Sequence, residues 1–353
     1  MSRTTKEDSA NIEVQPAVAP EQNDSGATPH AKKHFSRKRK CKIVVDSCGD
    51  FSAAIARRID VEVIGFPYVD ESGEEHIDDM WQTADAHEFY EGMRKGAHYH
   101  TASVSPGRYA EVFERIVTEE QLPVLYLAFT GGLSSSVYAA EQAAQAVMDE
   151  HPGSKVLVLD NLCPSTAAEL LAMEVCRLAD MGNTVEELYG WAADARYFVH
   201  GYFTLEGLDT LAAGGRIPAA AANVGGKLDI KPELSYDTDG SLVLCGMCRG
   251  RKKALRAMVA HFLEGYSHDP ALPVSIVDAD ASKDADWLEA TIRKNKGCED
   301  LVIIRNTVSP ILGTHVGPGM VAITFWGTDR RSKMTLADRI AQKVRGKGDG
   351  ADA

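Results

Sequence analysis

The chain has 353 residues, of which 44% are hydrophobic, and a formal net charge of -13. One hydrophobic core rarely organises a chain of this length, so we expect two domains together with some unstructured sequence. The negative charge argues against nucleic acid as the main partner, because phosphate binding needs a cationic face.

The sequence favours a cytoplasmic address. It contains no run of roughly 20 apolar residues that could span a membrane, and its first ten residues, MSRTTKEDSA, lack the apolar region of a signal peptide. The 7 cysteines are odd in number and scattered, which is typical of a reducing compartment. The basic run from His34 to Lys42 is interpreted as a solvated linker, with contact to an acidic partner or to membrane headgroups as the alternative.

Composition divides the chain into four parts. Residues 1–40 are rich in Ala, Pro, Glu and Asn and have too few apolar side chains to offset the entropy of ordering, so we expect disorder. An α/β domain is expected over 41–203 and a smaller mixed α+β domain over 204–328. In 329–353, helical spacing of Leu336, Ile340 and Val344 predicts a C-terminal helix and a tail.

Short apolar runs alternate with amphipathic stretches in the first domain. This alternation predicts right-handed βαβ crossovers and a mainly parallel sheet with helices on both faces. Strands are expected at Lys42–Val45, Val61–Val69, Val124–Phe129 and Lys155–Leu159. Helices are expected at Asp85–Lys95, Pro106–Glu120, Ser134–Asp149 and Thr166–Met181.

The pattern changes after a predicted helix at Val185–Ala195. A strand over Arg196–Phe203 is placed at the domain junction. The Asp-Gly pair within Ser235–Leu244 is a strong signal for a β-hairpin. Further strands are expected at Val274–Asp278, Leu301–Arg305 and Val321–Trp326, with helices between them.

Two hydroxyl-rich loops precede predicted helices in the first domain, His100–Gly107 and Thr130–Ser136. At the carboxyl edge of a parallel sheet, such loops are placed to bind an anion. Capping of the helix that follows is the alternative for each loop. The Thr130-Gly131-Gly132 sequence matches neither a phosphate loop nor a dinucleotide-binding pattern.

Two glycine-containing segments of the second domain carry candidate ligand-binding residues. Arg216 follows a Gly-Gly pair and is predicted at a helix start, where the helix dipole disfavours a cation, so we expect an acidic partner. His315 lies in a predicted glycine-proline turn between strands, from which its ring could reach a carboxylate in an interdomain cleft. A purely structural histidine is the alternative.

Cys245 and Cys248 have the spacing of a redox or metal pair, but no second pair follows them. They continue the predicted hairpin, whereas a thioredoxin-like pair opens a helix. Structural thiols are therefore favoured.

Read together, these segments resemble the DegV family of bacterial fatty-acid-binding proteins, also called FakB proteins. The resemblance runs from about Lys42 to Trp326 and includes the Asp-Ser-x-x-Asp motif at Asp46–Asp50. Looser matches are Thr101–Pro106 and Thr130–Ser136. Four closer matches follow in the family's order: Leu211–Ile217, Leu228–Pro232, Arg249–Leu255 and His315–Gly319.

The resemblance implies a non-catalytic carrier that holds a long-chain fatty acid between its two domains, with no cofactor and no bound metal. It implies that Thr101, Thr130, Ser134 and His315 meet the carboxylate. Ala102 and Gly131 replace serines of the family pattern, and His100 stands where a second threonine is common and could compensate. The carrier would present the carboxylate to a separate fatty acid kinase, whose acyl phosphate product feeds phospholipid synthesis, and transient membrane contact fits this role.

The cations Arg216, Arg249 and Arg251 are candidates for docking that kinase or for steadying the phosphoryl group. The alternative is an internal salt bridge for Arg216 and solvation for the other two.

Two other classes of function compete with the carrier. One is a serine-dependent acyltransferase or hydrolase, in which His315 activates Ser134 or Ser103, although no nucleophile-elbow pattern is present. The other is a signalling or structural module that acts through the basic linker and the C-terminal helix.

Overall fold

The computed structural model describes residues 39–218 and 229–333, which form a four-stranded, a six-stranded and a three-stranded sheet with helices packed around them. The predicted C-terminal helix, and nearly all of the segment predicted to be disordered, lie outside the described residues. Among the described residues, no helix is long and apolar enough to cross a membrane.

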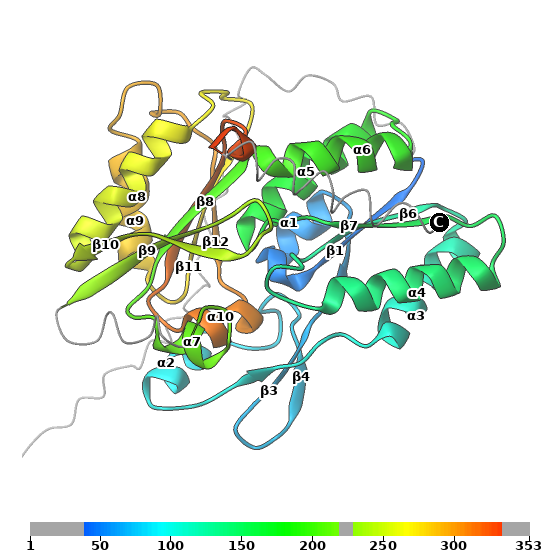
Figure 1. The fold of residues 1–353 in the computed structure, drawn as a ribbon, viewed down its shortest axis with the longest axis horizontal. Helices are drawn as coiled ribbons and strands as arrows, with labels where there is room; N and C mark the ends of the chain where they lie inside the picture. Colours follow the sequence, from blue (N-terminus) through cyan, green and yellow to red (C-terminus); the bar gives the residue numbers. More distant parts are fainter. Residues whose placement is uncertain (1–38, 219–228, 334–353) are drawn as a thin grey trace, which may run out of the picture. The chain divides into compact units, whose positions relative to one another are not determined.

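The four-stranded sheet is parallel throughout, as predicted, and has the order β2-β1-β6-β7. Its strands are β1 (Lys42–Asp46), β2 (Glu62–Ile64), β6 (Val124–Ala128) and β7 (Val156–Asp160). One face packs on α3 (Pro106–Arg115) and α4 (Ser136–Glu150). The other face packs on α1 (Ala53–Arg58), α5 (Thr166–Asp180) and α6 (Val185–Ala195), so helices cover both faces (Figure 1).

The predicted strand Val61–Val69 is wrong as one continuous element. The chain leaves the parallel sheet after β2 and forms β3 (Pro67–Val69), which pairs antiparallel with β4 (Glu75–Ile77) and β5 (His100–Thr101). Gly65 lies at the break, where a Cβ atom would come within 2.5 Å of the Asp78 carbonyl oxygen. The close approach of two backbone segments therefore divides the run, and apolar patterning carries no signal for it.

The six-stranded sheet is mixed, as predicted. Only β11 and β12 run parallel, within the order β10-β9-β8-β13-β11-β12. β8 pairs inside this sheet, although the predicted boundary at 203/204 assigns it to the first domain. The strands are β8 (Val199–Thr204), β9 (Ile230–Tyr236), β10 (Leu242–Arg249), β11 (Val274–Asp278), β12 (Ile303–Thr307) and β13 (Val321–Trp326).

Two long helices cover one face of the six-stranded sheet, α8 (Arg251–Gly265) and α9 (Ser282–Ile292). Three shorter helices, α2 (Ala86–Arg94), α7 (Asp209–Ala213) and α10 (Pro310–Val316), lie near one another in Figure 1, and α10 contacts both of the others. The remaining turns are 3₁₀ helices at Ser47–Gly49, Arg196–Phe198 and Arg330–Lys333, and a π-helical turn at Ile116–Glu120.

The predicted hairpin is confirmed as β9 and β10, joined through Asp239-Gly240. β10 continues beyond the predicted Leu244 and includes both cysteines, with a register shift between Leu244 and Gly246. Cys245 is exposed, and the Cys248 thiol donates to a Glu233 carboxylate oxygen at 2.6 Å. The cysteine pair therefore lies on a strand, as predicted, and not at the start of a helix.

Helix α5 is shared by the two large sheets. Its residues Val175 and Ala179 pack in the core of the parallel sheet, whereas Leu170 and Leu171 pack with Trp326 of the mixed sheet. Glu169 of this helix is fully buried and accepts hydrogen bonds from Asn306 Nδ2 at 2.8 and 2.9 Å and from Ser275 Oγ at 3.3 Å. A carboxyl group thus joins α5 to the neighbouring strands β11 and β12.

We expect Glu169 to make stability depend on pH. Burial raises the pKa of Glu169 to about 8, above the unfolded value of about 4.3. Its contribution to stability is therefore complete below the unfolded pKa and is lost as pH rises through the folded pKa. Between about pH 6 and 9, the unfolding free energy of the wild type should fall by on the order of a few kcal/mol more than that of Glu169→Gln.

Denaturant midpoints measured across this range test the expectation. Glu119→Gln is the matched control, because it makes the same chemical change at an exposed site. Parallel pH profiles for the wild type and Glu169→Gln would contradict it.

Candidate functional site

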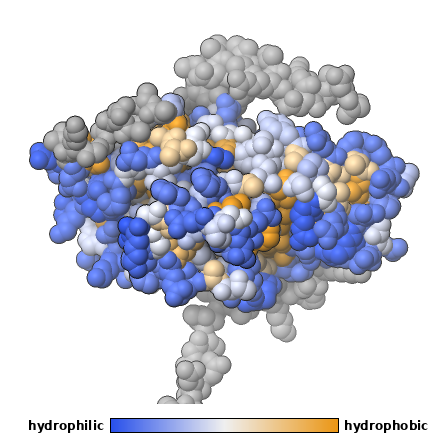
Figure 2. Space-filling model, turned by 90° about the horizontal axis from the view of Figure 1, so that it is seen from below, coloured by the Kyte–Doolittle hydropathy of each residue, from blue (hydrophilic) through white to orange (hydrophobic). Residues whose placement is uncertain are grey.

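A cavity of about 110 Å³ lies where elements of both large sheets meet. Its apolar wall is made of buried side chains that come from both halves of the chain, among them Phe66, Phe129, Phe203, Tyr236, Ile311 and Met320. The face of the protein seen in Figure 2 is mostly hydrophilic, with apolar residues in smaller patches among the hydrophilic ones. The apolar wall of the cavity is interior surface, because these six side chains are buried.

Polar side chains gather in one part of this lining: Thr101, Ser103, Ser134, Arg216 and His315. Thr101 lies on β5 and His315 on α10, and Thr101 Oγ1 is 2.9 Å from His315 Nε2. The structure thus brings together Thr101, Ser134 and His315, three of the residues that the sequence assigned to one site.

His315 does not lie in a glycine-proline turn, so that prediction is wrong. Residues 310–316 form α10, which begins with Pro310 in its first turn and ends at Gly317, where φ is 72°. The Ser309 hydroxyl caps it by accepting from Leu312 N–H at 3.3 Å. The Ser-Pro pair that signals this helix start was visible in the sequence, but the glycines that follow concealed it.

Helix α10 is attached to the first half of the chain by buried hydrogen bonds at its start. Asp50 Oδ1 accepts from Ser309 N–H at 2.8 Å. The Tyr90 hydroxyl and the Trp81 indole both donate to the Val308 carbonyl, at 2.8 and 3.1 Å. These contacts fix the position of His315, which is on the last turn of the same short helix.

The Asp46–Asp50 motif holds a second wall of the cavity as well. The Asp46 carboxylate accepts from Phe129 N–H at 2.6 Å and from the Tyr126 hydroxyl at 2.9 Å, so it anchors the loop that follows β6. Burial raises the pKa of Asp46 to about 7 and that of Asp50 to about 6. One turn after β1 therefore positions both the loop after β6 and α10.

Burial and the neighbouring Arg216 lower the pKa of His315 to about 4, so its imidazole is neutral at neutral pH. Its Nδ1 atom is buried, and no group among the described residues hydrogen-bonds to it. The Cα of Gly214 packs against that side of the ring, and a Cβ atom there would lie 2.4 Å from Nδ1. Gly214 is thus required for the present position of the imidazole.

Arg216 follows the C-terminal end of α7, and the helix predicted to begin after it lies outside the described residues. Its guanidinium donates to the carbonyl oxygens of Leu133, at 3.3 Å, and Gly214. Within the described ranges no acidic partner forms an ion pair with it, although the sequence predicted one. Burial lowers its pKa, and a cation after the end of a helix agrees with the direction of the helix dipole.

Thr130 does not line the cavity. Its hydroxyl donates to the Gly240 carbonyl at 3.3 Å and accepts from Gly132 N–H at 3.1 Å. A Cβ atom on Gly132 would come within 2.7 Å of the hairpin backbone, and one on Gly131 within 2.7 Å of the Asp160 carboxylate. Gly131, which replaces a serine of the family pattern, and the neighbouring Gly132 therefore allow the loop after β6 to pack against Asp160 and the hairpin.

The other candidates lie away from the cavity lining. His100 is exposed and borders a separate pocket. Arg249 is exposed at the end of β10. Arg251 pairs with Asp284 at 2.8 Å and donates to the Gly319 carbonyl. Arg251 is thus neither solvated nor free to move without breaking these contacts.

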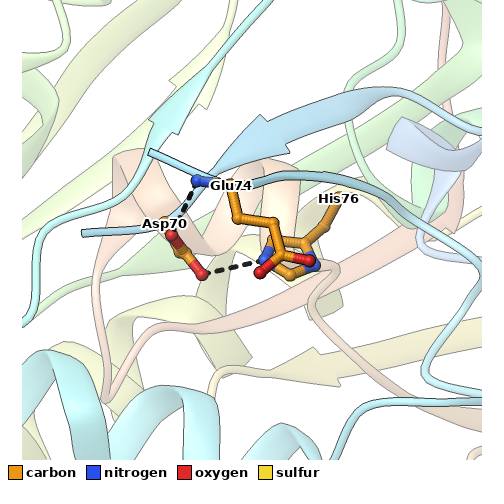
Figure 3. Close-up of side chains that lie close together, drawn as sticks. All are labelled: Asp70, Glu74 and His76. Atoms are coloured by element: carbon orange, nitrogen blue, oxygen red, sulfur yellow. Dashed lines mark hydrogen bonds and ion pairs between the residues drawn. The ribbon is translucent and has the colours of Figure 1, made fainter. Parts of the chain in front are cut away.

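Figure 3 shows a group of metal-binding residue types, Asp70, Glu74 and His76, on the β3–β4 hairpin. Asp70 Oδ1 accepts from the N–H groups of Ser72 and Glu74, at 2.8 and 3.1 Å, and its Oδ2 is 2.9 Å from His76 Nε2. These hydrogen bonds close the tight turn between β3 and β4, which explains why the three residues lie together. None of the three lines the cavity.

Two features of the site were missed by sequence reasoning. The Asp46–Asp50 motif was recognised as a family marker, but its role as an anchor was not. Gly214 was interpreted as part of a turn, and its contact with His315 was not foreseen. The sequence did contain a pattern that could have indicated the anchoring role of Asp46 and Asp50, because a buried strand runs directly into these two aspartates. The contact between Gly214 and His315 has no counterpart in the local sequence.

A buried apolar cavity with a polar end, built between a parallel and a mixed sheet, defines an α/β protein with a small-molecule site. Residues 40–327 match the sequence profile of a family described as "Uncharacterised protein, DegV family". The chain belongs to the DegV family.

The similarity extends over nearly the full length of two relatives in this family. The chain is 31% identical over 284 residues to the DegV domain-containing protein YteA of Lactococcus lactis, covering 80% of this chain and 96% of that protein. It is 27% identical over 289 residues to a DegV domain-containing protein of Clostridium perfringens, covering 82% and 98%.

Solved structures have the same fold. A DegV lipid-binding protein of Thermotoga maritima is 26% identical with a TM-score of 0.70, covering 82% of this chain and 99% of that one. A second T. maritima protein, whose structure is described as revealing a fatty acid binding function, is 25% identical with a TM-score of 0.69, covering 82% and 100%. The Streptococcus pneumoniae fatty acid kinase B3 protein loaded with linoleic acid is 21% identical with a TM-score of 0.70, covering 82% and 100%.

Gly214→Ala should displace the His315 imidazole, because the added Cβ overlaps Nδ1 while the backbone, with φ of -74°, tolerates alanine. We expect altered His315 ring resonances in NMR spectra and a destabilisation of roughly 1–3 kcal/mol. Gly190→Ala in α6 is the control, since nothing lies within 4 Å of its Cβ position, and it should be neutral or slightly stabilising. Unchanged His315 resonances in Gly214→Ala would refute the contact.

Proposed function

We propose that this protein binds one long-chain fatty acid, with the acyl chain in the apolar cavity and the carboxylate at its polar end. The observation that carries the proposal is the Thr101–His315 hydrogen bond, which lies at the polar end of a cavity whose wall includes many buried apolar side chains. Membership of the DegV family and the described fatty acid binding of a T. maritima relative support it. The bound fatty acid is the ligand, and the proposal requires no cofactor.

The tautomer of His315 sets the direction of the hydrogen bonds at this end. A proton on Nδ1 would leave a buried N–H without an acceptor, which is costly, so the proton is assigned to Nε2. Nε2–H then donates to Thr101 Oγ1, and the Thr101 hydroxyl is free to donate to a carboxylate. His315 therefore orients the hydroxyl, and Arg216 supplies positive charge nearby.

Ser134 lies in the same polar part of the lining and offers a second hydroxyl to the ligand. Its hydroxyl donates to Ser136 Oγ at 3.1 Å and accepts from Ser136 N–H at 3.2 Å, so it must turn away from Ser136 to donate to a carboxylate. We assign the carboxylate to Thr101 and Ser134. Thr130 and His100, which the resemblance also implied, act outside the cavity lining.

A carrier is favoured over a serine-dependent acyltransferase or hydrolase. A catalytic histidine of that kind activates a serine and is oriented by a third group on its other nitrogen. Here the Nε2 partner is Thr101, and Nδ1 faces Gly214. Labelling by a serine-directed fluorophosphonate would favour the enzyme instead.

A carboxylate held at the end of a cavity can be reached by a second protein. We propose that the carrier presents it to a separate kinase, which forms the acyl phosphate used in phospholipid synthesis. Arg249, exposed in a chain of net charge -13, is the cation best placed to dock an acidic face of that kinase. Arg251 is held by Asp284, so any docking role for it competes with an internal ion pair.

Affinity should rise with acyl chain length until the cavity is full, because each buried CH₂ group contributes roughly 0.8 kcal/mol. Calorimetric titration with saturated acids from acetate to stearate measures this. His315→Ala should weaken binding of the longer acids by roughly 1–3 kcal/mol, because Thr101 loses its orienting donor. The controls Cys245→Ser and Cys248→Ser should bind like the wild type, and equal affinity for acetate and palmitate would refute the proposal.

Presentation to a kinase is tested separately from binding. In a reconstituted assay with kinase and ATP, Arg249→Ala should keep wild-type affinity for palmitate but form acyl phosphate several-fold more slowly at subsaturating kinase, since rim charges act mainly on association. Lys296→Ala, at an exposed cation beyond α9, is the control. Acyl phosphate formation from ATP by this chain alone would contradict the proposal that a separate kinase phosphorylates the ligand.

A further inference from the structure

A second pocket of about 300 Å³ lies next to the polar end of the cavity. Both pockets are lined by Thr101, Arg216 and His315. The remainder of the second pocket is lined by both polar and apolar side chains from α2, β5, α7, α10 and the segment between α2 and β5. Its polar side chains include His98, His100 and Thr210. We call it the outer pocket.

The three shared side chains form a wall one residue thick between the cavity and the outer pocket. A carboxylate that accepts a hydrogen bond from Thr101 therefore lies directly beside the outer pocket. An atom added to a carboxylate oxygen would therefore lie at the boundary between the two pockets.

Formation of an acyl phosphate increases the negative charge of the ligand's head group beside the outer pocket. A carboxylate oxygen attacks the γ-phosphorus of ATP on the kinase, a new O–P bond forms, and the bond to ADP breaks with its electron pair leaving on ADP. The ligand passes from a carboxylate of charge -1 to an acyl phosphate of about -2, with three further acceptor oxygens. Thr101 and the neutral His315 can hydrogen-bond a carboxylate of charge -1, but they supply no positive charge to balance an acyl phosphate of about -2.

The outer pocket has the groups that the additional charge needs. Arg216 is partly desolvated, donates to the carbonyl oxygens of Leu133 and Gly214, and has no ion pair within the described ranges. His98 and His100 supply two exposed imidazoles, and Thr210 supplies a hydroxyl. Glu71 accepts from the backbone N–H of His98 at 3.0 Å but is not part of the lining.

We propose that the outer pocket is a phosphoryl subsite, which holds the phosphate of a long-chain acyl phosphate after transfer while the acyl chain stays in the cavity. This inference rests on the proposed function and goes beyond it. It assigns His100, which the sequence placed at the carboxylate, to the product rather than to the substrate. Retention of the product would let the carrier deliver a labile acyl phosphate without releasing it into water.

Two ligands with the same chain distinguish the two pockets. Palmitate carries only the carboxylate, and hexadecyl phosphate is a stable mimic of the phosphorylated head. Their affinities are measured by calorimetry for the wild type and for the double variant His98→Ala/His100→Ala. We expect the variant to lose about tenfold in affinity for hexadecyl phosphate, equal to about 1.4 kcal/mol, and less than about threefold for palmitate.

His268→Asn, at an exposed histidine outside both linings, is the matched control and should leave both affinities unchanged. Wild-type protein that binds palmitate but not hexadecyl phosphate would overturn the phosphoryl subsite and leave the carrier intact. Equal losses for the two ligands in the double variant, or no loss for either, would overturn it as well. Failure of the wild type to bind palmitate would instead overturn the proposed function and the subsite with it.

Discussion

The cavity depends on the attachment of α10 to the first half of the chain. The Val308 carbonyl accepts from Tyr90 and Trp81, and the Ser309 N–H donates to Asp50, and all three partners come from the first half of the chain. Because the bonds to Tyr90 and Asp50 are buried, breaking either would leave unpaired polar groups away from water. His315 is on the same short helix, so the ligand-binding imidazole is held by contacts made at the opposite end of α10.

Buried carboxyl groups join separate elements of the fold. Asp46, Asp50 and Glu169 are all raised in pKa by burial, and each accepts several hydrogen bonds from separate elements. Such groups are expensive to bury unless they are hydrogen-bonded or neutral. The protein thus uses costly polar contacts where two halves of the chain must meet in one arrangement, and apolar packing along α5 supplies the remaining contact area.

The loop after β6 shows how packing can change a binding motif. Glycine at 131 removes a hydroxyl that the family pattern places near the carboxylate. The structure explains the change, because a side chain at 131 would collide with Asp160. A side chain at the neighbouring Gly132 would collide with the β9–β10 hairpin. Thr130 stabilises the contact between this loop and the β9–β10 hairpin by donating a hydrogen bond to the Gly240 carbonyl. The remaining ligand-binding capacity is concentrated on Thr101, Ser134 and His315.

The sequence by itself determined the parallel sheet, the mixed sheet, the hairpin and three residues of the cavity, because these follow from local periodicity, turn chemistry and motif order. It did not determine the break at Gly65 or the helix that carries His315. Each depends on contacts between residues far apart in the chain, such as Gly65 with Asp78 and Gly214 with His315. Only the tertiary structure decided that Thr130 packs against the β9–β10 hairpin and that His100 borders a second pocket. The reason is that the side of a loop that faces a ligand is set by what packs against its other side.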